Sequence, residues 1–362
     1  MRWFVHLPAS CAVLTCQPVD ERRRAEFGAH LTRTLTGGAL TLLVSVGHRT
    51  GLFAAAAAGP ATSTELAARA GLHERYVREW LGAMVTGGFL SHADGVYTLP
   101  PEHAVFLTGE TATNAAPQAS MLRAFAGTLP ELERAFVEGG GVPHAAFAQH
   151  LAAVGARPGD TWKHVYDEQL VDGFLGAVPG LLDRLTAGAS VLDLGCGAGH
   201  AVRVAAEAFP ASRFTGLDID ADLIAEATGP ANATFVAGDA TRLPADPAYD
   251  VIMAFDAIHD QRDPAEVLRR VRAALAPGGL FVMVDTGFAS DLDENTGHPL
   301  AALCYAISLM YCTTASLADD GVALGAMWGV ELATEMVRAA SFTCVDVLDS
   351  PRPQNRVFVC RP

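Results

Sequence analysis

Short apolar runs alternate with amphipathic segments through the C-terminal half of the chain. Such alternation predicts strand–helix units and an α/β fold with a mostly parallel, doubly wound, Rossmann-like sheet. Because the last two runs lie close together, we expect them to form an antiparallel hairpin. Seven strands are predicted, at about residues 190–194, 213–217, 233–237, 249–255, 279–285, 343–348 and 356–360.

A second pattern, mainly helical, occupies residues 27–110. The apolar run 35–46 predicts one helix, and residues 61–71 and 73–86 predict two more, the first of these with a capped start. Residues 89–99 alternate on both sides of an Ala-Asp-Gly turn, which predicts a β-hairpin. Helix, turn, helix and hairpin together make a winged helix.

The remaining segments complete the predicted domain plan. Residues 1–26 contain an apolar stretch interrupted by proline, and we expect a disordered leader rather than a signal peptide. Residues 111–185 are expected to be a helical linker or lid, where the aromatic side chains of 160–168 could close over a ligand. Residues 186–362 form the sheet domain, with an insertion at 288–330.

The insertion contains an apolar run, Leu300–Leu317, that approaches membrane-spanning length. The run also carries Cys, Tyr, Ser and Thr side chains, so we interpret it as a buried helix that walls a pocket. No membrane partner is expected.

The segment Val191–His200 joins a buried strand to a helix through Gly195, Gly197 and Gly199. Glycines let the backbone turn tightly and approach a ligand, and the free N–H groups at the helix start face that ligand. The spacing is G-x-G-x-G rather than the dinucleotide G-x-G-x-x-G, and Asp193 precedes it. These features favour a site for a cationic ligand, S-adenosylmethionine (SAM), over a site for an NAD-type cofactor or a glycine loop that only forms a tight backbone turn.

Two further acids follow the next two predicted strands. Asp218 ends one strand, where a carboxylate can accept hydrogen bonds from a ribose diol, and Asp239 follows the other, placed for an adenine edge. We take their neighbours Ile219 and Ala240, and Phe255 at the end of the fourth strand, as further cofactor contacts.

Charge and cysteine usage limit the classes of partner. The formal net charge is −15, which argues against nucleic acid and anionic membrane surfaces as partners. The seven cysteines are scattered and form no C-x-x-C pair, as expected of a reduced, cytoplasmic protein.

The predicted winged helix raises the question of DNA binding. Residues 26–110 hold five Arg and seven acidic residues, so the charge opposes it. The apolar face with Tyr76, Trp80 and Met84, together with the helix 35–46, instead predicts a homodimer interface.

The chain resembles class I SAM-dependent methyltransferases, specifically bacterial proteins with an N-terminal winged helix and the layout of plant-type small-molecule O-methyltransferases. The resemblance covers about residues 27–362 and rests on four segments, Glu74–Gly88, Val191–Gly199, Phe255–Gln261 and Gly325–Gly329. It implies that the glycine loop with Asp193 holds the methionine portion of SAM, that Asp218 holds the ribose, and that Asp239 with Ala240 contacts the adenine.

His259 is the candidate general base, because an acceptor hydroxyl or enolisable carbon must lose a proton. Plant-type relatives place their base at the matching position, followed by an acid and Trp; here Asp260 fits and Gln261 departs. Asp285, ending the fifth strand, could orient the imidazole, and an ascending limb of the pH–rate profile is expected near about pH 6–7. A metal held by His259, Asp260 and His298 is the alternative, although no metal is assigned.

The insertion is expected to contact the acceptor through His298, Tyr305 and Met310, and Trp328 follows them. His298 could instead cap the following helix. The predicted function is methyl transfer to a small, largely apolar acceptor, by O- or C-methylation, in secondary metabolism. Two alternatives stay open: a SAM-binding enzyme that catalyses a rearrangement or cyclisation without methyl transfer, and a SAM-sensing transcription regulator.

Overall fold

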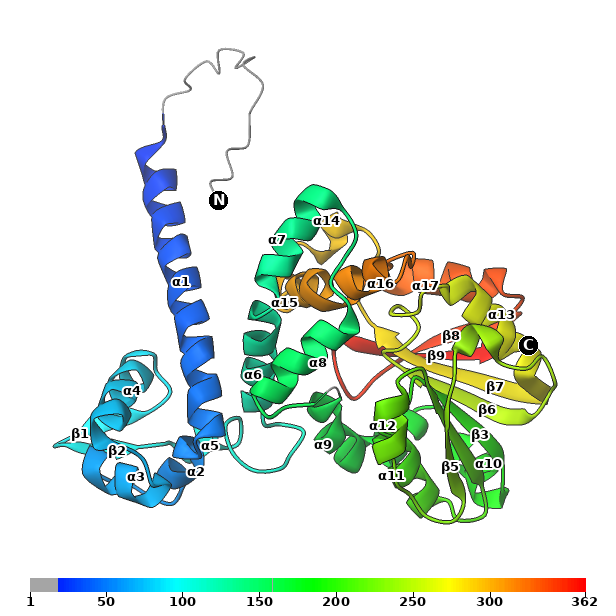
Figure 1. Ribbon diagram of the computed structural model, residues 1–362, viewed down its shortest axis with the longest axis horizontal. Coiled ribbons are helices and arrows are strands. Elements are labelled where there is room, and N and C mark those ends of the chain that lie inside the picture. The colour runs from blue at the N-terminus through cyan, green and yellow to red at the C-terminus, as the bar shows by residue number, and fades with distance from the viewer. Residues whose placement is uncertain (1–18, 158) are drawn as a thin grey trace.

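The C-terminal half of the protein is built on one seven-stranded sheet (Figure 1). In the computed structural model, which describes residues 19–157 and 159–362, the strand order is β5-β4-β3-β6-β7-β9-β8. Neighbouring strands are parallel except that β9 runs antiparallel to both β7 and β8. The predicted strands and the final hairpin are therefore confirmed. The strands are β3 (Ser190–Leu194), β4 (Arg213–Asp218), β5 (Ala233–Ala237), β6 (Tyr249–Phe255), β7 (Leu275–Thr286), β8 (Cys344–Asp349) and β9 (Asn355–Arg361).

Helices cover both faces of the sheet, which explains why the central strands read as continuous apolar runs. In β6, Val251 and Met253 belong to one hydrophobic cluster, whereas Ile252 and Ala254 belong to the other. The carboxyl ends of the parallel strands all meet at one edge, where loops can build a site. The covering helices are α10 (Leu181–Ala187) and α11 (His200–Ala208) on one face, α13 (Pro264–Ala274) and α17 (Gly329–Ala339) on the other, and α12 (Ala221–Glu226) beside β4 and β5.

The N-terminal domain is a winged helix at the foot of a long helix, as Figure 1 shows. Thr62 and Glu65 form the expected capping box at the start of its third helix. Asp94 and Gly95, between the two hairpin strands, both have positive φ, as a tight hairpin turn requires. The elements are α1 (Glu21–Arg49), α2 (Leu52–Ala57), α3 (Ser63–Ala70), α4 (Glu74–Thr86), β1 (Ser91–Ala93), β2 (Val96–Thr98) and α5 (Pro101–Ala104).

The first helix starts earlier than the sequence pattern suggests. Residues 21–26, expected to belong to a disordered leader, form the first turns of α1. The Asp20 carboxylate accepts hydrogen bonds from the backbone N–H groups of residues 22 and 23, so a helix cap overrides the weak periodicity. Residues 1–18 of the expected leader lie outside the described residues.

The sequence predicts an exposed apolar face on α4 that would form a dimer interface, and this part of the prediction is wrong. Trp80 and Met84 are buried in the winged helix's own core with Val77, whereas Tyr76 is 78% exposed. Residues on a helix are about 100° apart, so Tyr76 lies at the edge of a face centred on the other three. The domain therefore buries these residues by itself.

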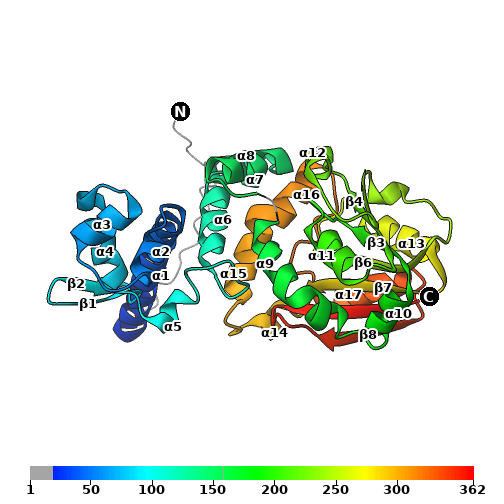
Figure 2. The ribbon, with the colours of Figure 1, turned by 90° about the horizontal axis from the view of Figure 1, so that it is seen from below.

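The linker helices and the insertion pack together between the winged helix and the sheet (Figure 2). The backbone N–H of Val142 donates to the carbonyl of Thr314, 3.1 Å away, and the ring of Tyr311 stacks on Phe125 at 5.1 Å. The linker contains α6 (Ala116–Ala126), α7 (Leu129–Glu138), α8 (His144–Ala153), α9 (Asp160–Gln169) and the π-helix η1 (Leu170–Leu175). The insertion contains α14 (Leu292–Asn295), α15 (Ala301–Ile307), the π-helix η3 (Ser308–Thr313) and α16 (Thr314–Ala318).

Within the part of the chain that the structure describes, one helical segment, Ala301–Ala318, is long and apolar enough to cross a membrane by length and composition. In the fold it forms α15, η3 and α16, and 33% of its residues are buried. Its apolar side chains meet the linker helices through a shared cluster that includes Phe125 and Phe147. The segment is thus an integral part of the folded domain.

Candidate active site

The glycine loop follows β3 and opens α11. Gly195, Gly197 and Gly199 have φ values of 76°, 53° and 78°. A side chain at position 195 or 199 would also collide with Ala257 or Phe235, so packing requires glycine there. At Gly197 no heavy atom lies within 4 Å of the position that a Cβ would take. Its backbone is therefore open to close approach by a ligand.

Two carboxylates lie beside this loop. The Oδ2 atom of Asp218 accepts a hydrogen bond from the backbone N–H of Gly197 at 2.7 Å, and Oδ1 accepts one from Asp220 N–H at 2.9 Å. Asp193 is only 3% exposed, and burial together with the charge of Asp218 raises its pKa to about 8. A bound cation would stabilise the ionised form of Asp193, so this donor set fits a positively charged ligand.

The other predicted cofactor residues lie at the neighbouring strand ends. Asp239 lies two residues after β5, its Oδ1 atom accepts hydrogen bonds from the N–H and hydroxyl groups of Thr241, and Ala240 beside it is buried. Ile219, just after β4, is 77% exposed. Phe255 ends β6, where Tyr166 of α9 packs edge-on against it at 5.4 Å. The structure thus gathers these residues along one edge of the sheet.

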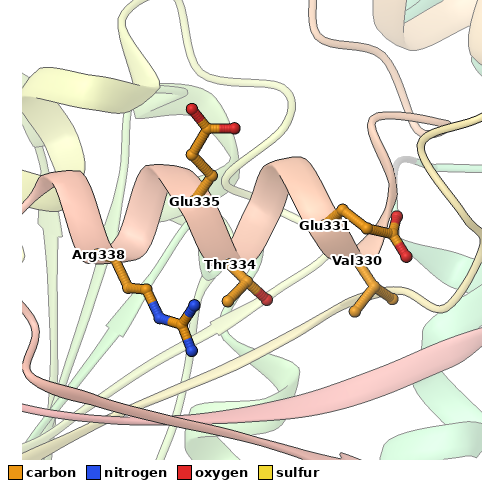
Figure 3. A pocket seen from close by; sticks show the side chains of 5 residues that line it. All are labelled: Val330, Glu331, Thr334, Glu335 and Arg338. Atoms are coloured by element: carbon orange, nitrogen blue, oxygen red, sulfur yellow. The ribbon is translucent and has the colours of Figure 1, made fainter.

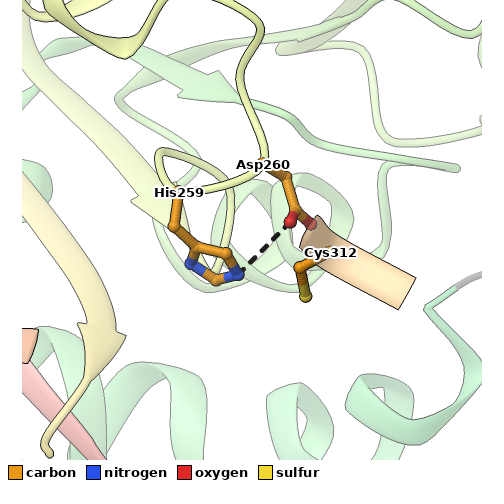
Figure 4. A group of neighbouring side chains, drawn as sticks. All are labelled: His259, Asp260 and Cys312. Atoms are coloured by element: carbon orange, nitrogen blue, oxygen red, sulfur yellow. Dashed lines mark ion pairs between the residues drawn. The ribbon is translucent and has the colours of Figure 1, made fainter. Parts of the chain in front are cut away.

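His259 lies after β6 in a buried polar cluster (Figure 4). Its Nδ1 atom is 2.8 Å from Oδ1 of Asp285, at the end of β7, and because a carboxylate only accepts, the imidazole donates. Its Nε2 atom is 3.4 Å from Oδ1 of Asp260 and faces Cys312 of η3. A neutral imidazole held this way carries its proton on Nδ1 and a lone pair on Nε2.

The charges around His259 favour its protonated form. Burial alone lowers the pKa of the imidazole, but Asp285 and Asp260 outweigh burial and hold that pKa well above its usual 6.5. Oδ1 of Asp260 and Oδ2 of Asp285 are buried without a hydrogen-bond partner among the described residues. Such oxygens strengthen the attraction of the cluster for a proton.

The predicted substrate residues lie in different surroundings. Trp328 is 3% exposed, and its indole N–H donates to Oδ1 of Asp285 at 2.9 Å. Met310 packs against the linker helices, in the cluster that contains Phe125. Tyr305 is half-buried against a smaller cluster formed within the insertion. Of these predicted substrate residues, only Trp328 makes a hydrogen bond to the His259 cluster within the described part of the chain.

His298 is not placed with the other proposed metal ligands. Its Nδ1 atom accepts a hydrogen bond from the backbone N–H of Leu300 at 3.2 Å, in the turn just before α15. Two overlapping groups of side chains surround His259, and in each group the nitrogen, oxygen or sulfur atoms lie within 4.8 Å of one another: His259 with Asp260 and Cys312, and His259 with Asp256 and Asp285. Proximity alone does not make a metal site, so these side chains are described together as one acid–base cluster.

Several side chains of the cluster were not found from the sequence. Asp256, directly after β6, has a left-handed φ of 46° and accepts a hydrogen bond from the side-chain amide of Asn355 at 2.9 Å. Burial and the charge of Asp285 raise the pKa of Asp256 to about 7. Arg352 faces Asp256 while its guanidinium stacks on Trp162 at 4.8 Å. These contacts join residues far apart in the chain, and no local sequence pattern predicts them.

A separate surface hollow of about 440 Å³ lies on α17 (Figure 3). Its lining side chains all come from that one helix, and Glu331, Glu335 and Arg338 among them point outward. It contains none of the cluster residues, so it is not a candidate for the chemistry.

Comparison with known proteins gives consistent matches. Residues 38–109 match the model of an Rv2258c-like winged HTH domain, and residues 185–338 match a methyltransferase domain. The chain is 30% identical over 290 residues to acetylserotonin O-methyltransferase of Mus musculus molossinus, covering 72% of each chain. Human N-acetylserotonin methyltransferase in complex with SAM superposes with a TM-score of 0.67 at 18% identity, covering 95% of this chain and 99% of that one. Mitomycin 7-O-methyltransferase MmcR superposes with a TM-score of 0.70 at 18% identity, covering 94% and 99%.

Proposed function

The chain belongs to the SAM-dependent methyltransferases that carry an N-terminal winged helix, and we propose that it methylates oxygen or carbon of a small, largely apolar acceptor with His259 as the base. The observation that carries this proposal is the buried pair of His259 and Asp285. His259 follows β6 and Asp285 lies near the end of β7, on the sheet edge that also holds the glycine loop.

SAM supplies an activated methyl group when it is bound. The open backbone at Gly197 and the buried carboxylate of Asp193 would hold its cationic methionine portion. Asp218 would accept hydrogen bonds from the ribose, and Asp239 with the buried Ala240 would contact the adenine. The fit rests on the pKa of Asp193, which burial raises to about 8 and which a bound cation would lower.

His259 would act through Nε2. Asp285 fixes the proton on Nδ1, so the lone pair of the neutral ring is on Nε2 and can remove a proton from the acceptor. The same carboxylate stabilises the imidazolium that results. Since Asp285 and Asp260 raise the pKa of His259, the base becomes available at higher pH than a free histidine would.

The acceptor would lie between the sheet edge and the insertion. Tyr311 of η3 packs against Phe125 and Phe147 of the linker helices in an apolar, aromatic wall, with Met310 packed against it. Cys312 covers Nε2 of His259, so the turn that carries it must shift for an acceptor to reach the base. His298 and Tyr305 would contact the acceptor at the outer end of the insertion. A wall of this kind suits an aromatic or otherwise apolar small molecule.

Incubation with SAM that carries a trideuteromethyl group tests the proposal. N-acetylserotonin and simple phenols are suitable acceptors, because the curated relative is named for acetylserotonin. A product that carries the labelled methyl group is expected from the parent protein, and much less from His259→Ala at equal SAM occupancy. An unlabelled isomer would instead support rearrangement.

We also propose that two copies of the chain associate through α1. Residues 21–39 are exposed along their whole length, and the helix stands away from the body in Figure 1. Phe27, Leu31, Leu35 and Leu42 recur at helical spacing, and Phe27 and Leu35 are 65% and 67% exposed. An apolar stripe of this length needs a partner, and a second α1 supplies the same spacing in return.

The winged helix is proposed to serve this assembly rather than DNA. On α4, Arg75 pairs with Glu79, and Arg78 pairs with Glu74 at 3.4 Å. The arginines of the helix that would enter a groove are thus neutralised by their own neighbours. Steep, salt-dependent binding to a specific duplex would overturn this assignment.

A further inference from the structure

We propose that Trp328 is a positioning residue that fixes the Asp285 carboxylate and sets the pH at which His259 becomes available as a base. This inference rests on the proposed function of His259. Oδ1 of Asp285 accepts three hydrogen bonds, from His259 Nδ1 at 2.8 Å, from Trp328 Nε1 at 2.9 Å and from the backbone N–H of Thr286 at 2.8 Å. Asp285 is fully buried, so these donors replace solvent around the charge.

The indole is itself held in place by a rigid connection. Trp328 precedes α17, and its carbonyl accepts from the Ser290 hydroxyl at 2.7 Å. The backbone N–H of Ser290 donates to Glu331 at 2.7 Å. Gly329 has a φ of 82°, and a Cβ there would lie 2.2 Å from the nitrogen of Ser290. The loop after β7 and the start of α17 therefore lock together and aim the indole at Asp285.

The direction of the effect follows from charge sharing. A carboxylate oxygen that accepts from Trp328 has less negative charge to offer the imidazolium of His259. Loss of the indole N–H would therefore strengthen the pair between His259 and Asp285 and raise the pKa of His259. The indole does not titrate, so it changes this pKa without adding a charge of its own.

Other titratable and charged groups also face this cluster. Asp260 lies in the same loop as His259, and Asp256 directly follows β6. Cys312 comes from η3, where burial and the charge of Asp260 raise the pKa of its thiol to about 12, and Arg352 faces Asp256 from the loop before β9. A variant at position 328 leaves all four of these side chains in place, so a shift in the pH profile would report the lost indole donor.

The test compares Trp328→Phe with Trp80→Phe. Phenylalanine keeps an aromatic ring and removes the N–H. Trp80 is a matched control, because it is also buried and its indole donates at 2.9 Å, to a carbonyl in the winged helix. In Trp328→Phe, the ascending limb of kcat/KM should move up by about 0.5–1 pH unit, which lowers kcat/KM on that limb by about 3- to 10-fold, with SAM affinity unchanged. Equal pH profiles in the parent and both variants would overturn the proposal.

Nuclear magnetic resonance provides a second test that needs neither Trp328→Phe nor an acceptor. In the parent protein, one indole N–H resonance should titrate with the midpoint of His259, and His259→Gln should abolish that titration. If none of the indole N–H resonances shifts as His259 titrates, the proposal is overturned. If the indole titrates but no acceptor is methylated, the positioning role stands and the proposed reaction fails.

Discussion

Nδ1 of His259 lies 2.8 Å from Oδ1 of Asp285, and both side chains are almost fully buried. His259 lies in the loop after β6 and Asp285 lies near the end of the adjacent parallel strand β7, so the sheet brings the two residues to the same edge. In this relationship Asp285 decides which nitrogen keeps the proton and how strongly the imidazolium is held.

Asp285→Asn should shift the pH dependence of the reaction downward. An amide carries no charge, so the pKa of His259 falls toward the value that burial favours, and the ascending limb of kcat/KM moves to lower pH. Turnover should fall by about 10- to 100-fold, because charge-assisted orientation of the ring is lost. Asp183→Asn, at an exposed position on α10, is the matched control. An unchanged profile in Asp285→Asn would rule out electrostatic control by Asp285.

SAM binding should be linked to loss of a proton from Asp193. The pKa of this buried carboxyl is raised to about 8, so it is largely protonated at neutral pH, and a bound cation favours its ionised form. Below that pKa, SAM affinity should therefore rise with pH, with up to one proton released for each SAM bound. Calorimetry in buffers of different ionisation enthalpy measures this number. Asp193→Asn should bind SAM without proton release, whereas equal release in both proteins would assign the proton elsewhere.

Asp218→Ala should weaken SAM binding by about 1–3 kcal/mol, the usual value of hydrogen bonds to a charged group. The substitution also removes the acceptor that holds the N–H of Gly197, so the glycine loop loses its anchor. Asp222→Ala, an exposed acid on α12 nearby, controls for the change in net charge. The ribose role would be refuted by equal SAM dissociation constants for Asp218→Ala and the parent.

The proposed association through α1 should be broken by charge on its apolar stripe. Leu31→Glu with Leu35→Glu should convert a dimer into monomers in light scattering at micromolar concentration, since like charges would face each other across the two-fold axis. Arg33→Glu with Thr36→Glu, on the opposite side of the same exposed helix, should leave the dimer intact. A parent protein that is monomeric under these conditions would refute the interface.

The sheet and the loop chemistry were predictable because each depends on local pattern. Strands buried on both faces read as apolar runs, and the positive φ of Gly197 matches its place in the loop. The contact between His259 and Asp285 was also foreseeable, because parallel strands end at the same edge of a sheet.

The surroundings of His259 depend on features that a single sequence does not display. Cys312 belongs to a π-helix, whose wider turn shifts the residues that follow, so helical spacing of 3.6 could not show which side faces His259. Trp328 meets Asp285 from a distant part of the chain, through the geometry of Gly329. The exposure of Tyr76 likewise depended on how the winged helix closes its own core.

The most direct test of the account is the pH dependence of kcat/KM for the parent and His259→Ala with a methylated acceptor. We expect an ascending limb above pH 6.5 in the parent, higher than the sequence alone suggested, because Asp285 and Asp260 raise the pKa of His259. In His259→Ala the limb should vanish and the rate should fall by about 10²–10⁴-fold, while SAM affinity stays the same. A variant that keeps the parent's rate and pH profile would contradict the assignment of His259 as the base, and loss of activity with a chelator that ferrous iron restores would replace the base with a metal.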